Sequence, residues 1–423
     1  MTKQPGNRRV AGLIDSGGVY ASRATAADGF VFFASTAMDE TGATATEATP
    51  APPYVASSSA HARAQAKYVV EQLGGALGEL GSSINDICQI EQYVKLKAHA
   101  DPYFTVVTDP GLMGASRPQG ATAQLSGFIP RESVISVTGL AIVPDAEAGL
   151  AKSYPGEDPA KPAQGLFSRL AAAGPYAFTT FFATDNKTGV HPSALAEIWN
   201  WRGSEIRSEA EFGLETLAQR LAPAGASLAD TVDYTLFLAD IGDLYDFDLV
   251  FKDAFGDVAP TRTVIPSLGF ANPRREGAFG HEENAPRMEI QLRCLRAESG
   301  LQRVAVDGPG AGFGSQSAGV RVDPLLWISS HYADVERHSD GIDREIDDAL
   351  AKIEATCSNA GTELKNLLRI RAIVASDAAA MAFYAGLRRA VPKDPPAVSM
   401  IVAGTELLVP GASVALDGVA WLG

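Results

Sequence analysis

The chain has 423 residues, more than one ordinary hydrophobic core accommodates, so two to four domains are expected. Its composition, 46% hydrophobic and 20% charged, is that of a globular protein, and its net charge of −15 argues against an extended nucleic-acid surface, which needs clustered Lys and Arg. No stretch approaches the roughly 18 apolar residues of a membrane span, and no His or Cys spacing indicates a metal site.

The first copy of a repeated pattern begins at Gly18. A Gly-Val-Tyr opening leads to an apolar strand, a polar turn, an amphipathic helix that stops at Gly, a strand, a shorter helix and two closing strands. The predicted elements are strands 18–24 and 29–35, helix 61–81, strand 86–96, helix 101–109, and strands 121–128 and 134–143.

The same order of features returns twice, and the Gly-aromatic openings at Gly18, Gly165 and Gly312 are equally spaced. Copy 2 predicts strands 165–171 and 176–184, helix 207–225, strand 230–240, helix 244–255, and strands 263–270 and 288–295. Copy 3 predicts strands 312–318 and 325–331, helix 342–361, strand 366–376, helix 379–390, and strands 397–404 and 413–422. Equal spacing and matched Gly stops favour triplication over a chance similarity of α+β domains.

The fold class expected is therefore α+β, with three tandem domains of β-β-α-β-α-β-β order. Their predicted bounds are 10–145, 163–298 and 310–423, and the segments 146–162 and 299–311 are predicted linkers.

Copy 2 resembles the RidA (YjgF-like) family of enamine/imine deaminases. The resemblance rests on the Gly-aromatic opening, on the run GASLADTVDYTLFLADIGDLYDFDLVFKDAFGDVAPTRTV, and on the closing strand MEIQLRC. It is weaker in copy 1 and weakest in copy 3. Family members are usually short chains that form trimers with ligand pockets between subunits. The resemblance thus implies a chorismate-mutase-like fold and a pseudo-trimer within one polypeptide, closed on itself.

The resemblance also implies three site residues in copy 2: Arg262 to grip a substrate carboxylate, Glu289 on the last strand to handle a water, and Asp248 on the second helix. A guanidinium binds a carboxylate through two parallel hydrogen bonds, which suits the first role. The alternatives are a structural salt bridge for Arg262, an exposed strand edge for Glu289 and a solvated helix face for Asp248.

The other copies lack these chemical groups. In the closest alignment, Gly120 of copy 1 and Ala397 of copy 3 take the place of the Arg, with Arg117 three residues early in copy 1. The residues aligned with Glu289 are Ser136 in copy 1 and Ala415 in copy 3, and Asp417 lies two residues after Ala415. We therefore expect one competent site among three, in which Arg262 and Glu289 face each other.

Three further residues are candidates for substrate binding. Tyr20 matches an aromatic residue that reaches a neighbouring pocket in the family, and Phe167 and Phe313 are its expected counterparts. Arg274 and His281 lie in an insertion at 271–286, and long insertions in compact domains are often functional. The alternatives are a core aromatic for Tyr20 and a surface loop for the insertion. A second insertion, 197–207, carries two Trp residues suited to an aromatic substrate or to packing.

Three functions fit this pattern. The first is a metal- and cofactor-independent hydrolase or deaminase that acts on a C–N or C=N bond of a small, possibly aromatic carboxylate. The second is a non-catalytic protein that binds or senses a small acid through Arg262 alone. The third, a three-repeat ring-opening hydrolase of cyclic amides, needs paired Ser and Lys residues, and the DSGG at 15–18 is not repeated in the other copies.

The expected partner is a small carboxylate-bearing molecule, without nucleic acid or membrane, and the expected state is a monomeric pseudo-trimer or a small homo-oligomer. Cys88, Cys294 and Cys357 are few and far apart, which fits a reducing compartment rather than a disulfide framework. The first residues lack the apolar segment of a signal peptide. The sequence therefore predicts a cytoplasmic protein.

Overall fold

The computed structural model of the chain describes residues 8–145, 150–158, 166–184, 190–195, 204–270, 286–309, 316–335 and 341–423. Copy 1 comprises β2 (Val19–Ala27), β3 (Phe30–Thr36), α1 (Ser58–Glu79), β4 (Ile87–Val94), α2 (Ala100–Val107), β5 (Gln119–Gln124) and β6 (Ile135–Ile142). Copy 2 comprises β8 (Leu170–Ala173), β9 (Tyr176–Phe182), α3 (Glu205–Leu221), β10 (Thr231–Leu238), α4 (Leu244–Phe251), β11 (Thr261–Pro266) and β13 (Met288–Leu295). Copy 3 comprises β15 (Gly319–Val322), β16 (Leu325–Tyr332), α5 (Ile342–Asn359), β17 (Leu367–Val374), α6 (Asp377–Ala390), β18 (Ala397–Val402) and β19 (Val414–Trp421).

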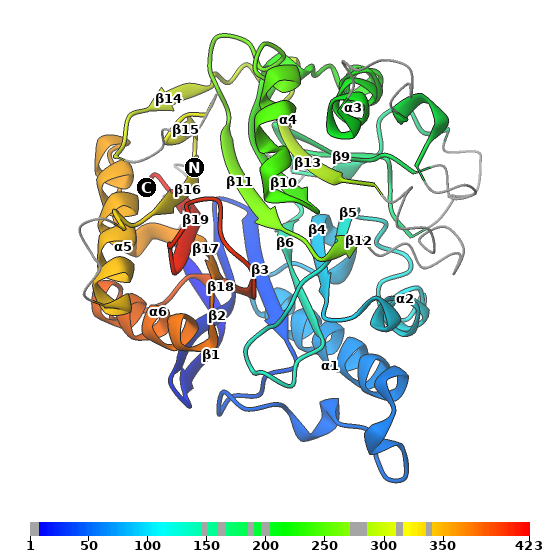
Figure 1. The fold of residues 1–423 in the computed structure, drawn as a ribbon, viewed down its shortest axis with the longest axis vertical. Helices are drawn as coiled ribbons and strands as arrows, with labels where there is room; N and C mark the ends of the chain where they lie inside the picture. Colours follow the sequence, from blue (N-terminus) through cyan, green and yellow to red (C-terminus); the bar gives the residue numbers. More distant parts are fainter. Residues whose placement is uncertain are drawn as a thin grey trace.

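The strands run in the same order within each copy: β5-β4-β6-β3-β2, β11-β10-β13-β9-β8 and β18-β17-β19-β16-β15. The first two strands of each series are parallel, and the other neighbours are antiparallel. The two helices of each copy pack on one face of its sheet and bury an apolar cluster there. Figure 1 shows the three helix pairs around the outside of the molecule and the strands inside. The predicted β-β-α-β-α-β-β order is confirmed in all three copies.

An extra strand precedes each copy and pairs antiparallel with its first strand; it has eight residues in copy 1 and only two or three in copies 2 and 3. These strands are β1 (Arg9–Ser16), β7 (Lys152–Ser153) and β14 (Val304–Val306), paired with β2, β8 and β15. β7 and β14 lie in the segments predicted as linkers. The sequence does not predict them, because strands of two or three residues are too short to show an alternating pattern. A further short strand, β12 (Gly269–Phe270), leaves copy 2 and pairs with β5 of copy 1.

The same backbone hydrogen bond joins each copy to the next. An N–H donates to a proline carbonyl over 3.1 Å in all three cases: Ser168 to Pro118, Ser317 to Pro260 and Ser22 to Pro396. The first bond joins copy 2 to copy 1, the second joins copy 3 to copy 2, and the third returns from copy 1 to copy 3. The three copies therefore form a closed ring within one chain, as the pseudo-trimer prediction requires. We call the three boundaries the 1–2, 2–3 and 3–1 junctions.

A basic residue before each copy fastens that copy to the carbonyl groups of its neighbour. Lys152 is opposite Ala173 on the first strand of copy 2, and Arg8 and Arg303 directly precede Arg9 and Val304, the first paired residues of β1 and β14. The Lys152 Nζ donates to the carbonyls of Asn85, Ile87 and Ser116, and the Arg303 guanidinium to those of Ala229, Thr231 and Val258. The Arg8 Nε donates to the Leu367 carbonyl over 2.8 Å. We call these three residues the basic clamps.

Charged side chains fill the centre of the ring. Glu91, Thr235 and Arg371 are the fifth residues of β4, β10 and β17, and the three side chains contact one another. Because equivalent residues of three copies meet only at a common axis, this contact locates the pseudo-threefold axis. Three Arg and three acidic residues, all buried, surround it and balance in charge. This axial network consists of Glu91, Asp233, Arg293, Arg369, Arg371 and Asp417.

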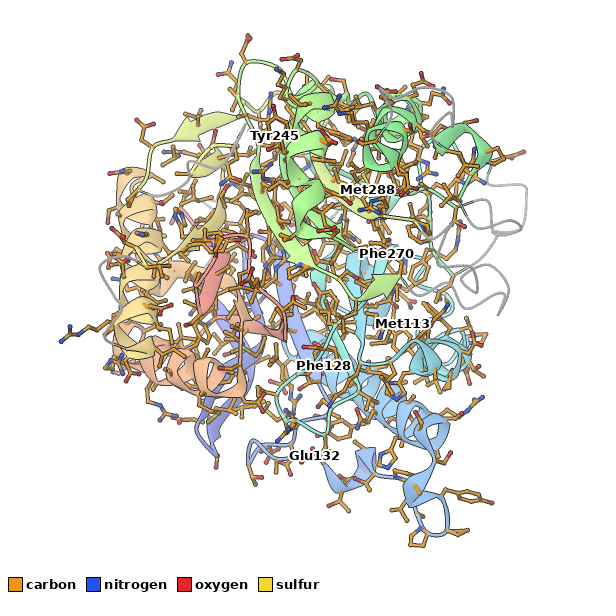
Figure 2. The ribbon with its side chains drawn as sticks, in the orientation of Figure 1. Met113, Phe128, Glu132, Tyr245, Phe270 and Met288 are labelled. Atoms are coloured by element: carbon orange, nitrogen blue, oxygen red, sulfur yellow. The ribbon has the colours of Figure 1, made fainter. Side chains whose placement is uncertain are left out.

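Glu91 is the acid that links all three copies. Its carboxylate accepts from Arg293 Nη2 and from Arg371 Nη1, each over 2.8 Å. Burial opposes ionisation, but these two guanidinium charges lower the pKa of Glu91 to about 2. An apolar cluster packs at one end of the network and includes Phe128 and Phe270, which are labelled in Figure 2.

Candidate functional site

Arg262 lies at the 2–3 junction. It is the second residue of β11, and its backbone N–H donates to the Ser329 hydroxyl of β16 in copy 3 over 3.0 Å. On its other side β11 runs parallel to β10, with Arg262 opposite Tyr234. The side chain of Arg262 is only 1% exposed. The structure thus places the guanidinium inside the protein, where an unpaired charge would be costly.

Among the described residues, side chains from copies 2 and 3 contact this guanidinium. The Asp248 carboxylate of α4 accepts from Nη1 over 2.5 Å, the Gln316 carbonyl of copy 3 accepts from Nε over 3.0 Å, and the Tyr234 hydroxyl accepts from Nη1 over 3.5 Å. We call these four residues the Arg262 cluster. The Asp248 side chain is 22% exposed, so it is the member of the ion pair that faces solvent. Burial raises the pKa of the Asp248 carboxyl, and the adjacent Arg262 charge opposes this rise.

Glu289 does not face Arg262, and the expectation that it does is wrong. On β10, Arg262 is opposite Tyr234 while Glu289 is opposite Phe237. Because these two partners are three residues apart on one strand, alternation puts Arg262 and Glu289 on opposite faces of the sheet. Arg262 points toward the helices of copy 2, where Asp248 lies, and Glu289 points to the inner side of the ring.

Glu289 instead lies at the 1–2 junction. Its carboxylate accepts from the Thr122 N–H of β5 over 3.3 Å, and the residue is 5% exposed. Burial raises the pKa of Glu289 well above its usual range, and the charge of Glu91 raises it further, while the Thr122 N–H opposes the rise. The two residues that the sequence analysis combined in one site therefore belong to two different junctions.

The strand registers identify the residues that replace Arg262 in the other copies. Gly120 is opposite Ile90 on β4, and Val398 is opposite Ile370 on β17, in the place that Arg262 takes opposite Tyr234. Gly120 is as expected from the sequence. Val398 corrects the expected Ala397, which lies one residue earlier. The residues equivalent to Glu289 are Ser136 in copy 1 and Ala415 in copy 3, as expected.

The 1–2 junction is apolar where the 2–3 junction is charged. The ring of Phe167 fills the space beside Gly120, and a Cβ on that glycine would lie 2.5 Å from it. Phe167 packs edge-on against Phe104, with ring centroids 5.9 Å apart. Phe104 is the fifth residue of α2, as Asp248 is of α4. An aromatic pair has thus taken the place of the Asp248–Arg262 ion pair.

Tyr20 lies at the 3–1 junction, so its predicted contribution to a site with Arg262 is wrong. The side chain is 3% exposed within an apolar cluster of copy 3 residues, and the Arg388 guanidinium of α6 lies over its ring at 4.7 Å. The inter-copy hydrogen bonds of Ser22 and Ser168 further show that Phe167 is equivalent to Ala21, not to Tyr20. The physical reason is the order of the copies: the first strand of copy 1 meets copy 3.

The remaining candidates lie outside the described residues. This applies to Arg274 and His281, to Phe313, and to the two Trp residues of the 197–207 insertion. Within the described ranges, no group of three or more His, Cys, Asp or Glu side chains is arranged to hold a metal ion. No helix in the same ranges is long and apolar enough to cross a membrane.

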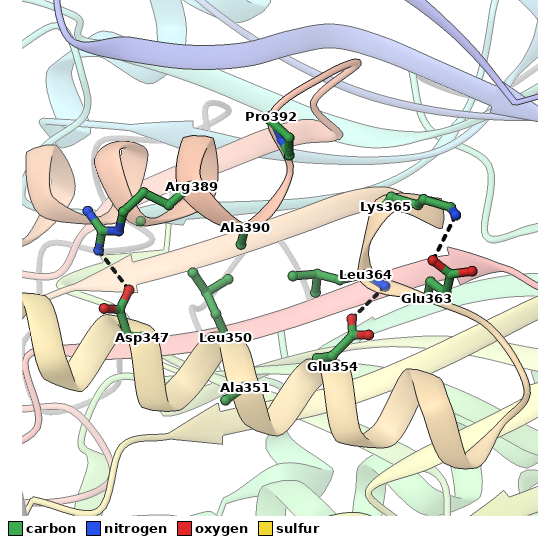
Figure 3. Close-up of a pocket in the computed structure, with 11 residues that line it drawn as sticks. Asp347, Leu350, Ala351, Glu354, Glu363, Leu364, Lys365, Arg389, Ala390 and Pro392 are labelled. Carbon is green, nitrogen blue, oxygen red and sulfur yellow. Dashed lines mark hydrogen bonds and ion pairs between the residues drawn. The ribbon is translucent and has the colours of Figure 1, made fainter.

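A groove of about 550 Å³ lies away from the junctions, between α5 and α6 on the outside of copy 3 (Figure 3). Its charged residues pair with one another: Arg389 with Asp347, and Lys365 with Glu363. The Glu354 carboxylate accepts from the Leu364 N–H. Because these charges are already satisfied, the groove has the character of a solvated helix surface.

The axial network was not expected from the sequence. A signal for it was present: the strands ICQIEQYV, TVDYTLFL and LLRIRAIV each carry charged residues within a fully buried apolar run. Fully buried charges must be paired, so the three strands had to supply partners for one another. The pairing itself needs the ring geometry, which no single copy reveals.

Known proteins resemble this chain in sequence or in structure. The Schizosaccharomyces pombe protein mmf2, mitochondrial, is 25% identical over 131 residues, which are 31% of this chain and 94% of that protein. A chorismatase crystal structure has a TM-score of 0.50 at 12% identity and covers 79% of this chain and 93% of its own. A member of the YjgF/YER057c/UK114 family from Mycobacterium tuberculosis has a TM-score of 0.25 at 25% identity and covers 28% and 99%. No protein-family model matches the chain.

The three copies are RidA-like domains. A relative of single-domain length matches less than a third of the chain, and the described elements repeat that domain three times. The RidA-like ring shares its overall fold with the chorismatase. The cytoplasmic location expected from the sequence is contradicted by the curated relative, which is named as mitochondrial.

Proposed function

We propose that the chain is a hydrolase or deaminase that acts on a C–N or C=N bond of a small carboxylate-bearing metabolite at the Arg262 cluster. The observation that supports this most directly is the difference between equivalent junctions. Arg262 and Asp248 form a partly buried ion pair at the 2–3 junction, whereas Gly120 and Phe104 stand in their places at the 1–2 junction. Of these two junctions, the 2–3 junction therefore has the side chains that can bind a carboxylate and transfer a proton.

Arg262 is the proposed anchor for the substrate carboxylate. The 1–2 junction offers an internal example of how such a group is held, because there the Glu289 carboxylate accepts from the backbone N–H of Thr122. Val264 is the equivalent residue of β11, two positions after Arg262, so its N–H points to the same edge of the strand as that of Arg262.

Asp248 is the proposed proton acceptor, and it takes over the part that the sequence analysis gave to Glu289. For an imine substrate, water adds to the carbon of the C=N bond, and the nitrogen keeps the electron pair of the broken π bond. Asp248 accepts the proton that water loses and returns it to the nitrogen. The hydroxyl of this carbinolamine then gives its proton to the nitrogen, and the C–N bond breaks with its electron pair on the nitrogen, so that ammonia leaves as the carbonyl forms. Burial raises the pKa of the Asp248 carboxyl, which makes this carboxylate a stronger proton acceptor than an exposed Asp.

The test is ammonia release from a 2-imino acid generated in the assay, measured beside the binding of the corresponding 2-oxo acid. Arg262→Ala is expected to lose at least about tenfold of the binding and most of the turnover, because a charged hydrogen-bond pair is removed. Asp248→Asn is expected to lose turnover with little loss of binding. Arg117→Ala serves as the matched control, because Arg117 pairs with Glu157 beside the apolar junction. Equal turnover in Arg262→Ala and wild type would rule the proposal out.

A further inference from the structure

β1 is the edge strand of copy 1. It runs over Arg9–Ser16 and pairs antiparallel with β2 along its whole length. Among the described residues, no backbone hydrogen bond joins β1 to any element other than β2. Its outer N–H and C=O groups can therefore pair with a strand from another chain. Figure 1 shows the hairpin of β1 and β2 at the rim of the molecule, near α6.

The equivalent strands of the other copies offer no such edge. β7 has two residues and β14 has three, whereas β1 has eight. Edge strands are usually kept short, because a long one can add strands from another chain. Two or three residues are enough to carry the basic clamps of copies 2 and 3. The greater length of β1 is therefore not needed to fasten one copy to the next.

The sequence of β1 complements itself when two such strands run antiparallel. It reads RVAGLID over residues 9–15, with two apolar residues on each side of Gly12 and opposite charges at the two ends. With Gly12 opposite Gly12, every apolar residue faces an apolar residue, and Arg9 faces Asp15 twice. Cross-strand pairs of both kinds stabilise a sheet. The strand bends at Gly12, where φ is +62°, and this pairing puts the bend at the same place in both strands.

The side chains that this pairing uses are accessible. Leu13 is 53% exposed, and the side chain of Asp15 is 44% exposed. Asp15 also pairs with Arg388 of α6, and the Arg9 Nη2 donates to the Leu80 carbonyl over 2.9 Å. A carboxylate and a guanidinium each have further acceptor or donor positions, so both can take a second partner. Their contacts within the chain hold them at the two ends of the strand.

We propose that the chain forms a homodimer in which the β1 strands of two copies pair antiparallel around a two-fold axis at Gly12. The partner is a second copy because the strand complements itself in charge and in apolar pattern. A two-fold interface uses the same surface on both chains and closes, so neither β1 edge remains open. The inference goes beyond the proposed function and does not depend on it, because the Arg262 cluster lies at the 2–3 junction.

Sedimentation velocity of the full chain at about 100 µM tests the dimer, because a dissociation constant of about 10 µM already gives mostly dimer there. Wild type should sediment with twice the mass of one chain. Leu13→Lys puts a charge among the apolar pairs and should raise the dissociation constant at least about tenfold. Leu96→Lys is the matched control, because Leu96 is 50% exposed and lies outside β1. It should leave the dimer unchanged.

An exchange of charges tests the register. Arg9→Asp places two acids opposite each other at both ends of the paired strands, and Asp15→Arg places two Arg residues there. Each variant alone should associate about tenfold more weakly than wild type. An equimolar mixture should recover the dimer with one chain of each kind, because every end pair is then Arg with Asp. The double variant should recover it with itself.

Three outcomes overturn the inference. The first is a wild-type chain that sediments as a monomer at this concentration. The second is a dimer that Leu13→Lys leaves as tight as wild type, because the interface then lies elsewhere. The third is a failure of the two charge variants to associate when mixed, although both are folded in thermal unfolding. If a charge variant unfolds, the exposed Leu13 still provides the test.

Discussion

Replacement of Glu91 by Gln is the most direct test of the axial network. The change keeps the shape of the side chain and removes its charge. Glu91 accepts from Arg293 and Arg371 over 2.8 Å, from the Tyr93 hydroxyl over 2.5 Å and from the Thr235 hydroxyl over 3.1 Å. The variant leaves three buried guanidinium groups with two acids. Breaking a buried ion pair in this way costs about 3–5 kcal/mol, and we expect a loss of about 4 kcal/mol for Glu91→Gln.

The measurement is urea unfolding at pH 7 with an unchanged m-value. The exposed Glu132→Gln is the control and should stay within about 0.5 kcal/mol of wild type. Arg371→Gln combined with Glu91→Gln restores the charge balance, so the double variant should lose less than the two single losses together. Because the pKa of Glu91 is lowered in the folded protein, its contribution to the free energy of unfolding is complete above about pH 4.5 and is lost as the pH falls toward about 2. A loss below about 1 kcal/mol at pH 7 would refute the reasoning.

Two further predictions use one copy as the control for another. Burial raises the pKa of Glu209 to about 8. The contribution of this group to the free energy of unfolding is therefore complete below about pH 4.5, and about 4 kcal/mol of it is lost as the pH rises through 8. Gln65 of copy 1 accepts from the Val134 N–H as Glu209 accepts from the Arg287 N–H, so Glu209→Gln imitates copy 1. Urea unfolding of this variant should show no loss of stability between pH 5 and pH 8. The same loss in the variant as in wild type would show that Glu209 does not cause it. Gly120→Ala should cost about 1–3 kcal/mol by calorimetry, because its Cβ meets the Phe167 ring, and Phe167→Ala in the same chain should relieve the loss. Full stability of Gly120→Ala alone would show that the 1–2 junction is not tightly packed.

The order of elements was predictable because each depends on local sequence. The amphipathic pattern and Gly stop at 342–361 predicted a helix that the structure places at Ile342–Asn359. Register was less predictable. The third-copy counterpart of Arg262 was misplaced by one residue, at Ala397 instead of Val398, since the preceding prolines mark a turn but fix no strand partner. A slip of one residue moves a side chain to the other face, so the error matters for a site.

Which residues meet in one site was harder to predict than which residues are candidates for function. Arg262, Asp248 and Glu289 are all buried or partly buried polar groups, as functional residues often are. Which of them meet depends on strand pairing and on how the copies are arranged in the ring. The sequence contains the alternation that separates Arg262 from Glu289, but only the shared partner strand β10 shows that they are on opposite faces.

The basic clamps have a consequence for the connectivity of the chain. Arg8 joins copy 1 to Leu367 of copy 3 at a boundary that the backbone between the copies does not cross, while Lys152 and Arg303 act at boundaries that it does cross. The non-covalent boundary therefore has the same fastening as the two covalent ones. A circular permutant that joins the present ends and opens the chain between copies 1 and 2 should fold to the same ring, held at its new opening by Lys152.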